Sequence, residues 1–394
     1  MNIAILIPEL CGGGAQRVAQ ILGNYYAEKG NNVYYFMRDI NARQDYRVKG
    51  KIIKINIKTC MEEGLNKIQI ISRLMASSLM IRKQKRKYNI DVAISFMEEF
   101  NYLNILSKGR EKVIVRVCTI LSKRPELKGF VYQRDIVKFF YSKADKVVIM
   151  SQYAFNELRC YFGIPMNKIV KIPNAVVSRE AAKKESEWQY GDKVIICVAR
   201  LDPVKQQDRI IRAFSYVKRE EKQAKLLLLG RGPSLNYLSK LCKKYQIEDS
   251  VFFEGFTNNL PYYLKSVKAF VMASKVEGFP NSMIEAMNYG VPVITTDSPG
   301  ACGEIVGKSL SKVTDKGFKL CKYGILTPDM PNEKLEADSQ LTEPEIVLGE
   351  AMLEILINDN CHQIYSRQSL KRANMFHIEK VIQKWNKVIY ESRE

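Results

Sequence analysis

The sequence predicts an α/β protein with two doubly wound domains, each built on a parallel sheet covered by helices. Three observations predict this fold class. Apolar runs of strand length alternate with segments of helical pattern, and this rhythm stops and then starts again along the chain. Strands that read as continuous hydrophobic runs are typical of parallel sheets with helices on both faces. With 394 residues, 46% of them hydrophobic, the chain can bury two cores of ordinary size.

The predicted strands fall into two sets, separated by the polar segment 178–192. The sets cover residues 3–8, 33–37, 51–57, 91–96, 112–117 and 146–150, then 194–199, 225–229, 251–255, 269–272 and 292–295. Residues 309–341 are rich in loop formers and are interpreted as an insertion, after which helix returns at about Glu343. We therefore expect one domain at residues 1–176, a second at 177–376 and a terminal helix within 377–394.

Positive charge is concentrated in the first half of the chain. The net charge is +20, from 62 Lys and Arg against 42 Asp and Glu. Residues 1–180 hold 31 basic and 15 acidic residues, or +16, which leaves 31 against 27, or +4, for the rest. This asymmetry indicates an anionic partner for the first half. Nucleic acid, anionic lipid and a phosphorylated substrate all fit the charge alone.

Several classes of protein are disfavoured by what the sequence lacks. No run approaches the roughly eighteen apolar residues that span a bilayer, and the first eight residues are interpreted as a strand rather than a signal peptide. We therefore expect a cytoplasmic protein. The nine cysteines form no CxxC pair and no Cys/His cluster, so their spacing predicts neither a disulfide framework nor a metal site.

Three consecutive glycines, Gly12, Gly13 and Gly14, follow the first predicted strand. Glycines let the backbone turn sharply and approach a ligand, and the start of the following helix attracts anions. A tight turn without a ligand is the alternative. The segment matches neither GxGxxG nor the Gly-Lys-Ser/Thr of a P-loop, which argues against nicotinamide and ATP-type sites.

Two strands of the second set end in segments that could meet a ligand, because ligands of open parallel sheets lie beyond the carboxyl ends of the strands. In VARLDPVK, Arg200 and Lys205 could clamp a phosphate from two sides, or form a solvated surface pair. In LLLLGRGP, residues 226–233, a buried strand runs into a glycine turn that either faces a nucleotide or simply leads to the next helix.

Two glutamates lie eight residues apart in KVEGFPNSMIEAMNYGVPVITTD, residues 275–297. Asn281 or Ser282 can cap a helix there, and Ser282 and Glu285 match a capping box, which predicts a structural role for Glu285 in the first turn of that helix. Glu277 lies in the preceding Gly/Pro turn and has no such explanation. A carboxylate there is well placed to accept hydrogen bonds from a polyhydroxylated ligand.

Together these segments resemble the retaining GT-B glycosyltransferases of the family-four group, over nearly the whole chain. The resemblance lies in GGGAQR after the first strand, ADKVVIMS at 144–151, IPNAV at 172–176, VARLDPVKQQD and LLLLGRGP. Its most specific part is EGFPNSMIEAM followed by GVPVITTD, which matches the E-x7-E signature of the group.

The resemblance implies two Rossmann-like domains facing a central cleft, an acceptor-binding first domain and a nucleotide-sugar-binding second domain. It implies that the C-terminal helix, near 378–391, crosses back onto the first domain. It implies catalytic roles for Arg200, Lys205 and Glu277, the two cations binding the donor's diphosphate as it leaves and Glu277 lying near the transferred sugar. Glu285 would hold the ribose hydroxyls. Further donor contacts are implied for Gly12, Gly13, Gly14, Gly278, Phe279, Pro280 and Asn281.

The activity implied is transfer of a hexose or N-acetylhexosamine from a nucleotide diphosphate sugar, with UDP the expected nucleotide, to a saccharide acceptor. Neither a metal nor a separate general base is expected, because the leaving phosphate helps to deprotonate the acceptor. Glu98, Glu99 and Asn101 could line the acceptor pocket or form a solvated loop. Many relatives carry a histidine at a strand end of the first domain. Here the only histidines are His362 and His377, and the strand KVIVRV continues with Cys118 and Thr119, which leaves the role of Arg116 open.

The segment 68–87 connects the charge to the acceptor. It places Ile68, Ile71, Met75 and Leu79 on one helical stripe and ends in RKQKRK. Such a run is either a solvated helix end or a means of attachment to an anionic bilayer, where each Lys or Arg contributes about 1 kcal/mol. We expect a polyprenyl-diphosphate-linked acceptor in cell-envelope or capsular polysaccharide synthesis, and peripheral association with the inner face of the cell membrane.

Two rival functions fit parts of the sequence. A basic nucleic-acid-binding protein would explain the charge, but it leaves the E-x7-E turn unexplained and no RRM, KH or helix-turn-helix pattern is present. We therefore expect no nucleic-acid partner. Another GT-B enzyme, a sugar-nucleotide epimerase or an inverting transferase, is the nearer alternative, and the anomeric configuration of the product separates it from a retaining enzyme.

Overall fold

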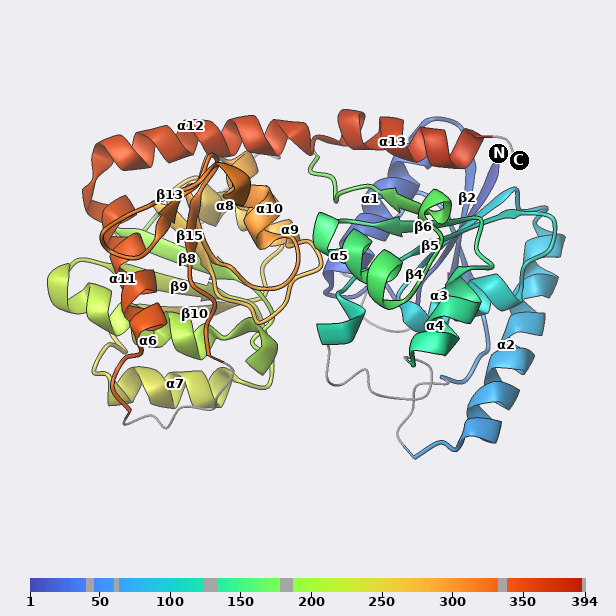
Figure 1. The fold of residues 1–394 in the computed structure, drawn as a ribbon, viewed down its shortest axis with the longest axis horizontal. Coiled ribbons are helices and arrows are strands. Elements are labelled where there is room, and N and C mark those ends of the chain that lie inside the picture. The colour runs from blue at the N-terminus through green and yellow to red at the C-terminus, as the bar shows by residue number, and fades with distance from the viewer. Residues whose placement is uncertain (40–45, 60–63, 124–132, 178–186, 332–338, 392–394) are drawn as a thin grey trace. The chain divides into compact units, whose positions relative to one another are not determined.

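The structure is a computed structural model that describes residues 1–39, 46–59, 64–123, 133–177, 187–331 and 339–391. The chain forms two compact units, which we call unit 1 (Met1–Ala175 with Ile378–Glu394) and unit 2 (Val176–His377). Each unit contains one sheet flanked by helices (Figure 1). The predicted fold class, α/β with two Rossmann-like doubly wound domains, is confirmed.

Unit 1 is built on a seven-stranded sheet in which every strand pair is parallel. The order is β3-β2-β1-β4-β5-β6-β7. The central strands β4 and β5 are buried at every residue, as predicted for continuous hydrophobic runs. The strands are β1 (Asn2–Leu6), β2 (Asn32–Met37), β3 (Lys51–Lys54), β4 (Val92–Phe96), β5 (Lys112–Arg116), β6 (Lys146–Ile149) and β7 (Ile169–Lys171). Strand β7 was not predicted, because three residues are too few to show a pattern.

The helices of unit 1 connect these strands and cover the sheet (Figure 1). One layer consists of α2, α3 and α4, in which α2 and α4 both pack against α3. The helices are α1 (Gly14–Glu28), α2 (Lys67–Lys87), α3 (Glu98–Leu106), η1 (Leu121–Lys123), α4 (Arg134–Tyr141), α5 (Gln152–Asn156), η4 (Glu157–Tyr161), η5 (Met166–Lys168) and α13 (Ile378–Tyr390).

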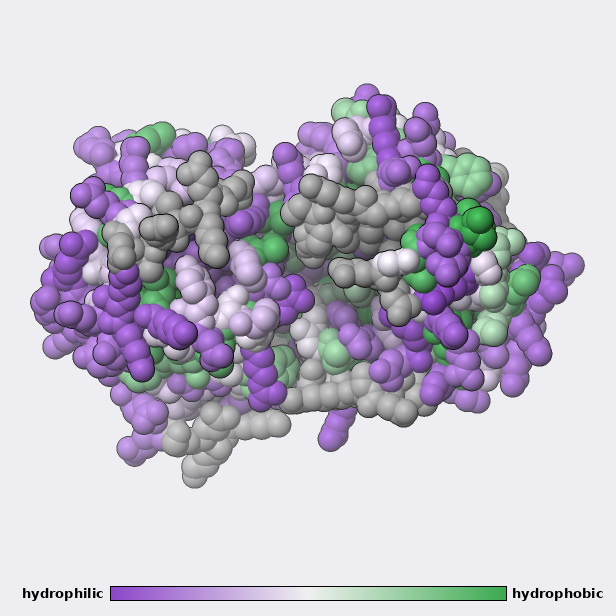
Figure 2. All heavy atoms as spheres, turned by 90° about the horizontal axis from the view of Figure 1, so that it is seen from below, coloured by the Kyte–Doolittle hydropathy of each residue, from purple (hydrophilic) through white to green (hydrophobic). Residues whose placement is uncertain are grey.

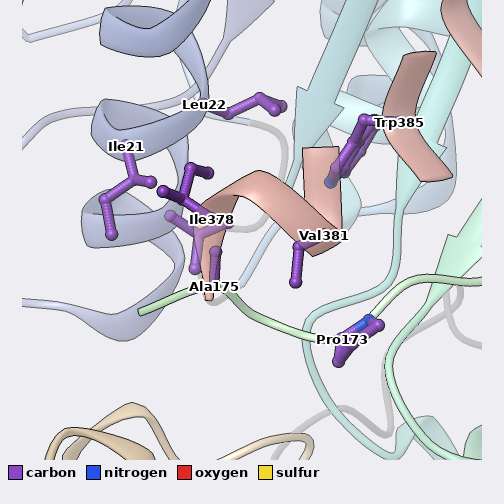
Figure 3. Close-up of a pocket in the computed structure, with 8 residues that line it drawn as sticks. Ile21, Leu22, Pro173, Ala175, Ile378, Val381 and Trp385 are labelled. Carbon is purple, nitrogen blue, oxygen red and sulfur yellow. The ribbon is translucent and has the colours of Figure 1, made fainter. Parts of the chain in front are cut away.

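The C-terminal helix α13 packs into the core of unit 1. Its buried residues follow a helical spacing, namely Val381, Ile382, Trp385, Val388 and Ile389. They belong to the same apolar cluster as strands β1, β2 and β4. Figure 3 shows a small apolar pocket at this junction, where Ile21 and Leu22 of α1 lie near Ile378, Val381 and Trp385 of α13.

A buried ion pair ties α2 to the loop before β5. The Lys85 ammonium lies 2.8 Å from Oε1 of Glu111, and the two side chains are 2% and 4% exposed. Lys85 also donates to the backbone carbonyl and side-chain oxygen of Asn104, at 3.0 and 2.7 Å. Burial lowers the pKa of Lys85 to about 8 although Glu111 opposes the shift. The pair therefore depends on both partners being present.

We expect Lys85→Met to destabilise unit 1 by about 3–5 kcal/mol, because it leaves the Glu111 carboxylate buried without its cation. The double variant Lys85→Met/Glu111→Gln removes both charges and should recover most of that loss. Denaturation curves of the parent, the two single variants and the double variant measure the coupling. Additive losses would show that the pair contributes no coupling.

Unit 2 is built on an eight-stranded sheet in the order β10-β9-β8-β11-β12-β15-β14-β13. The first six strands in this order, from β10 through β9, β8, β11 and β12 to β15, pair in parallel. Strands β14 and β13 continue the sheet in antiparallel pairing. The strands are β8 (Val194–Val198), β9 (Lys225–Leu229), β10 (Val251–Gly255), β11 (Ala269–Met272), β12 (Val293–Thr296), β13 (Lys312–Val313), β14 (Lys319–Leu320) and β15 (Ile325–Thr327).

The helices of unit 2 follow the predicted alternation with strands. Helix does return at Glu343, where α11 begins. The Glu345 carboxylate of α11 accepts from Arg209 and Arg212 of α6 at 3.1 and 2.7 Å, which joins the two helices. The helices are η6 (Pro203–Lys205), α6 (Gln207–Glu220), α7 (Leu235–Lys244), α8 (Leu260–Leu264), α9 (Asn281–Asn288), α10 (Cys302–Val306), η7 (Lys308–Leu310), α11 (Glu343–Ile357) and α12 (Asp359–Met375).

The interpretation of residues 309–341 as an insertion is wrong in part. The segment holds β13, β14 and β15, and β15 is a buried parallel neighbour of β12. Strands of two or three residues are too short to show an apolar period, and their pairing with distant residues is decided by the sheet. Residues 332–338 of this segment, and 178–186 of the predicted linker, lie outside the described residues.

Candidate active site

The site is built at the carboxyl edge of the unit 2 sheet. Strands β8 and β11 are neighbours there, and each is followed by a short segment that carries a predicted residue. Lys205 is the last residue of η6, which follows β8, and Glu277 follows β11. The amide of Lys275 donates to the carbonyl of Val204 at 2.9 Å, so the backbone joins the two segments. The sheet therefore brings together residues that are 72 positions apart.

Lys205 and Glu277 form a direct ion pair. The Lys205 ammonium donates to Oε1 of Glu277 at 2.5 Å. The two side chains are 22% and 10% exposed, so the pair is largely shielded but Lys205 still reaches the surface of the unit. A lysine held in this way presents a fixed positive charge at the edge where ligands of parallel sheets bind.

The Glu277 backbone is held by a close approach of Gly300. The Glu277 amide donates to the Pro299 carbonyl, and the Ala301 amide donates to the Glu277 carbonyl, each at 3.1 Å. Gly300 has φ +127°, and a Cβ on it would lie 1.7 Å from the Glu277 carbonyl oxygen. Only glycine fits this position. Gly300 was not predicted as a site residue, although the Pro299-Gly300 dipeptide after a predicted strand is a turn signal.

Two buried cysteines lie close to the ion pair. The pKa of Cys197 and of Cys302 is raised to about 12, chiefly by burial, and the Glu277 charge acts in the same direction. Both thiols are therefore neutral near pH 7 and do not supply a nucleophile. Within the described residues, no group of three or more His, Cys, Asp or Glu side chains could hold a metal ion.

Arg200 and Lys205 have different partners. The Arg200 side chain is 61% exposed, and its guanidinium lies 2.9 Å from Oδ2 of Asp202. The other oxygen of Asp202 accepts from the amide of Val204 at 3.0 Å and so begins η6. Asp202 thus orients Arg200 and the turn that carries Lys205. No role was predicted for Asp202, although an Asp before Pro is a turn signal.

The predicted capping box of Ser282 and Glu285 is wrong. Helix α9 begins at Asn281 with Pro280 as its N-cap, and no side chain caps it by a hydrogen bond. Ser282 is already inside the helix, so it cannot serve as the N-cap. Glu285 is the fifth residue of α9, half-buried, and lies beyond the first turn in which it was predicted. The position of Glu285 in the helix is therefore set by Pro280, after which α9 begins.

The turn between the two glutamates is buried. Glu277, Gly278, Phe279 and Pro280 are all buried, and Asn281 is half-buried. The Phe279 ring packs edge-on against Phe376, with ring centroids 5.3 Å apart. The Phe279 side chain therefore belongs to the core of unit 2, which leaves the backbone of the turn for the predicted donor contacts.

The glycine loop of unit 1 has the local geometry expected of it. Gly12 has φ +51°, Gly13 is the N-cap of α1 and Gly14 is its first residue. No side chain caps α1 by a hydrogen bond, and its first turn contains no acidic residue. A Cβ on Gly13 would lie 2.1 Å from Oε1 of Gln16. This end of α1 therefore keeps the positive character that the prediction of an anion site requires.

The polar residues predicted to line an acceptor pocket or to form a solvated loop are not in a loop. Glu98, Glu99 and Asn101 lie in the first turn of α3, and all three are buried. Glu99 pairs with Arg38 at 2.7 Å. Asn101 accepts from the Ser95 hydroxyl at 2.8 Å and donates to the backbone carbonyl of residue 116 at 3.0 Å. The solvated-loop alternative is therefore wrong.

Arg116, at the end of β5, is also buried, with 1% exposure. Its guanidinium donates to Oδ1 of Asn174 and lies 5.7 and 5.9 Å from the ring centroids of Phe96 and Trp385. Burial lowers its pKa. Arg116 thus connects β5 to α13 and to the segment after β7, inside unit 1.

These features define a class of protein: an α/β enzyme of two Rossmann-like units with a cation at a strand end of the second. A model described as "Glycosyl transferases group 1" matches residues 178–313, and one described as "Glycosyltransferase Family 4" matches residues 12–179. Together the two models span residues 12–313. These two matches support a glycosyltransferase of family 4.

Known proteins of this class resemble the chain over most of its length. An uncharacterized glycosyltransferase of Methanocaldococcus jannaschii is 28% identical over 365 residues, 87% of this chain and 89% of the relative. The N-acetylgalactosamine-N,N'-diacetylbacillosaminyl-diphospho-undecaprenol 4-alpha-N-acetylgalactosaminyltransferase of Campylobacter jejuni is 27% identical over 312 residues, 78% and 83% of the two chains. The structure of Anabaena HepE with UDP and glucose matches with a TM-score of 0.75 and 15% identity, over 100% of both chains.

Proposed function

We propose that the protein is a retaining glycosyltransferase that transfers a hexose or N-acetylhexosamine from a UDP-sugar to a saccharide acceptor carried on polyprenyl diphosphate. The observation that carries the proposal is the pairing of Lys205 with Glu277 at the carboxyl edge of the unit 2 sheet. Glu277 opens the E-x7-E segment, and Lys205 supplies the charge that a departing diphosphate requires.

The donor is assigned to unit 2. Lys205 and Arg200 bind the diphosphate, Glu285 the ribose hydroxyls, and Glu277 with the buried backbone of residues 278–281 the sugar. Each cation is paired with a carboxylate, the more exposed Arg200 with Asp202 and Lys205 with Glu277. A neighbour of the same fold that was solved with UDP and glucose supports the choice of nucleotide. In unit 1, the glycine loop at 12–14 is proposed to bind an anionic part of the donor.

The proposed chemistry needs no metal and no separate base. The bond between the anomeric carbon and the β-phosphate oxygen breaks, and its electrons remain on that oxygen. The acceptor hydroxyl forms the new bond on the same face of the sugar, and its proton passes to the departing phosphate oxygen. Lys205 stabilises the charge that develops on the diphosphate, which is the largest contribution a fixed cation can make.

The acceptor and cellular setting rest on charge and on one relative. The relative from C. jejuni acts, by its name, on a diphospho-undecaprenol-linked saccharide. The +16 carried by residues 1–180 favours an anionic surface or substrate for unit 1. We therefore propose a cytoplasmic protein, peripherally attached to the inner face of the membrane, that acts in cell-envelope or capsular polysaccharide synthesis and has no nucleic-acid partner.

A donor screen with product analysis tests this function. UDP at about 100 times its Kd should raise the free energy of unfolding by about 2.7 kcal/mol, whereas GDP and ADP should give less protection. A preference for GDP would replace UDP as the nucleotide. NMR of the product should show the anomeric configuration of the donor sugar. An inverted product, or epimerised free nucleotide sugar without transfer, would contradict the retaining assignment.

A further inference from the structure

Arg231 lies in the loop between β9 and α7, at the carboxyl edge of the unit 2 sheet, and it is exposed. The glycine turn that carries it was predicted either to face a nucleotide or to lead simply to the next helix. Ligands of parallel sheets bind at this edge, and a guanidinium is well suited to bind phosphate. The surroundings of Arg231 therefore decide between the two predictions.

The loop that carries Arg231 is fixed by the backbone on both of its sides. The Gly230 amide donates to the carbonyl of Gly255, the last residue of β10, at 2.7 Å. On the other side, a Cβ on Gly230 would lie 1.9 Å from the Ala199 carbonyl oxygen. A Cβ on Gly232 would lie 2.1 Å from the Leu201 carbonyl oxygen. Only glycine permits these approaches, so the residue between the two glycines is presented from a rigid turn.

The backbone ladder between β8 and β9 continues past the strand ends and places two arginines beside each other. Within the strands, Val198 pairs with Leu229. The Leu201 amide donates to the Arg231 carbonyl at 3.0 Å, as the same register requires two residues further along. Arg200 is therefore the register partner of Arg231. Neighbouring strands lie about 4.8 Å apart, so the two guanidinium groups can reach one ligand.

Of these two arginines, one has a carboxylate partner. Asp202 pairs with Arg200 at 2.9 Å, and its other oxygen accepts from the Val204 amide at 3.0 Å. Among the residues that the structure describes, no carboxylate forms an ion pair with Arg231. The carboxylate of Glu254, near the end of β10, accepts from two tyrosine hydroxyls at 2.7 and 3.1 Å. Like charges on paired positions repel each other, and an anion bound between them removes that repulsion.

A solvated arginine is the alternative interpretation of Arg231. Figure 2 views the molecule from below Figure 1 and shows that hydrophilic side chains predominate on the face of unit 2 that carries α7, the helix after this loop. Two observations distinguish Arg231 from such side chains. It lies at the ligand edge of the sheet, and its partner in the ladder is Arg200, which we assign to the donor's diphosphate. Two adjacent guanidinium groups suit a ligand with more than one charged group.

We propose that Arg231 binds the α-phosphate of the donor, the phosphate next to the ribose. The inference rests on the proposed function, which assigns the sugar to Glu277 and the departing phosphate to Lys205. The sheet order runs from β11 through β8 to β9, so Arg231 follows a strand that lies one place further from Glu277 than the strand before Lys205. Along the donor, the group one step further from the sugar than the β-phosphate is the α-phosphate.

This assignment gives the two phosphates of the donor different cations. The charge that develops during transfer lies on the β-phosphate oxygen, which Lys205 stabilises. The charge of the α-phosphate does not change, so Arg231 binds the ground state and the transition state equally well. Loss of Arg231 should therefore raise KM for the donor and leave kcat within about twofold, whereas loss of Lys205 lowers kcat.

Titration calorimetry of the full chain with uridine, UMP and UDP tests the proposal without the transfer reaction. Arg231→Gln should weaken UMP and UDP alike, by about tenfold or more, because a charge-assisted hydrogen bond to the α-phosphate is lost. Its affinity for uridine should not change. Lys205→Met should weaken UDP and leave UMP within about twofold. Arg231→Lys should recover part of the loss, because it returns a point charge without the planar fork.

Arg367 provides a matched control. It is an exposed arginine on α12 of unit 2, and the donor contacts that we propose do not include it. Arg367→Gln removes the same charge from the same unit, so it should leave the affinity for all three ligands within about twofold. Both variants change exposed side chains, and their unfolding temperatures should match the parent. Equal losses in Arg367→Gln and Arg231→Gln would mean that net charge sets the affinity, which would overturn the proposal.

Three further results would also overturn it. If Arg231→Gln weakened uridine as much as UMP, the residue would bind the nucleoside. If the variant weakened UDP but not UMP, the residue would bind the β-phosphate together with Lys205. If no affinity changed, Arg231 would be a solvated side chain.

Failure of the proposed function gives a different result from failure of the role of Arg231. A parent protein that binds no nucleoside diphosphate would overturn both. Normal binding of UDP by the parent and by Arg231→Gln would overturn only the role of Arg231. Where the donor screen selects GDP in place of UDP, guanosine, GMP and GDP make the same comparison.

Discussion

Replacing Lys205 with methionine should lower kcat by about 10²–10³-fold. Methionine keeps most of the apolar stem but removes the charge that we propose stabilises the departing diphosphate. Loss of one preorganised donor of this kind costs about 2.7–4 kcal/mol of barrier. Steady-state kinetics with the donor identified in the nucleotide screen measures the loss. Lys205→Arg should recover part of it, because a cation returns at a different position.

Lys193 provides a matched control for Lys205. It precedes β8, at the opposite end of the strand that leads to Lys205, and it too forms an ion pair with a glutamate, Glu221. Lys193→Met therefore removes a comparable pair from the amino edge of the same sheet. Its kcat should stay within about twofold of the parent. Equal losses in the two variants would mean that stability, and not phosphate binding, explains the effect of Lys205.

Gly300→Ala should both destabilise unit 2 and reduce activity. A Cβ at this position would lie 1.7 Å from the Glu277 carbonyl oxygen, so the backbone of one segment has to move. The positive φ of +127° adds strain of about 1–3 kcal/mol. We expect a total loss of about 3 kcal/mol or more, measured by chemical denaturation. The folded fraction should also transfer sugar more slowly, because Glu277 and its partner Lys205 are displaced.

Gly191→Ala separates the two effects at Gly300. Gly191 also has a positive φ, +76°, but a Cβ there would meet nothing within 4 Å. The free energy of unfolding of this variant should fall only by the cost of the backbone conformation, about 1–2 kcal/mol, and its activity should not change. If Gly300→Ala were as stable and as active as Gly191→Ala, Gly300 would have no part in holding Glu277.

The strands that position the site were predictable because they are long enough to show a pattern. Strands β8 and β11 are buried apolar runs. The Arg/Lys motif follows β8, and the E-x7-E motif follows β11. The short strands β13, β14 and β15 were not predictable, since two or three residues show no period. The capping box at Ser282 failed for a related reason. A four-residue motif predicts where a helix begins only if no stronger turn signal lies nearby. Here Pro280 is the stronger signal, and it is the N-cap of α9.

The burial of individual side chains was less predictable than the elements themselves. Glu98 and Asn101 lie in a polar stretch, yet both are buried because α3 packs between α2 and α4. Ile68 and Leu79 form an apolar row that in most helices would face a core, yet both are exposed. Both sets of residues show the same helical periodicity, which does not say which side of a helix faces the core. Which side faces the core is decided by neighbouring helices that are distant in sequence.

The sequence by itself determined the α/β class with two Rossmann-like units, the resemblance to family 4 glycosyltransferases and the residue types available at the strand ends. Each of these depends on local patterns of a few to some twenty residues. Only the tertiary structure decided that Lys205 is joined to Glu277. It alone decided that Gly300 approaches Glu277 and that the stripe of α2 faces outward. The physical reason is that such contacts depend on strand order and helix packing, which bring together residues that no local pattern relates.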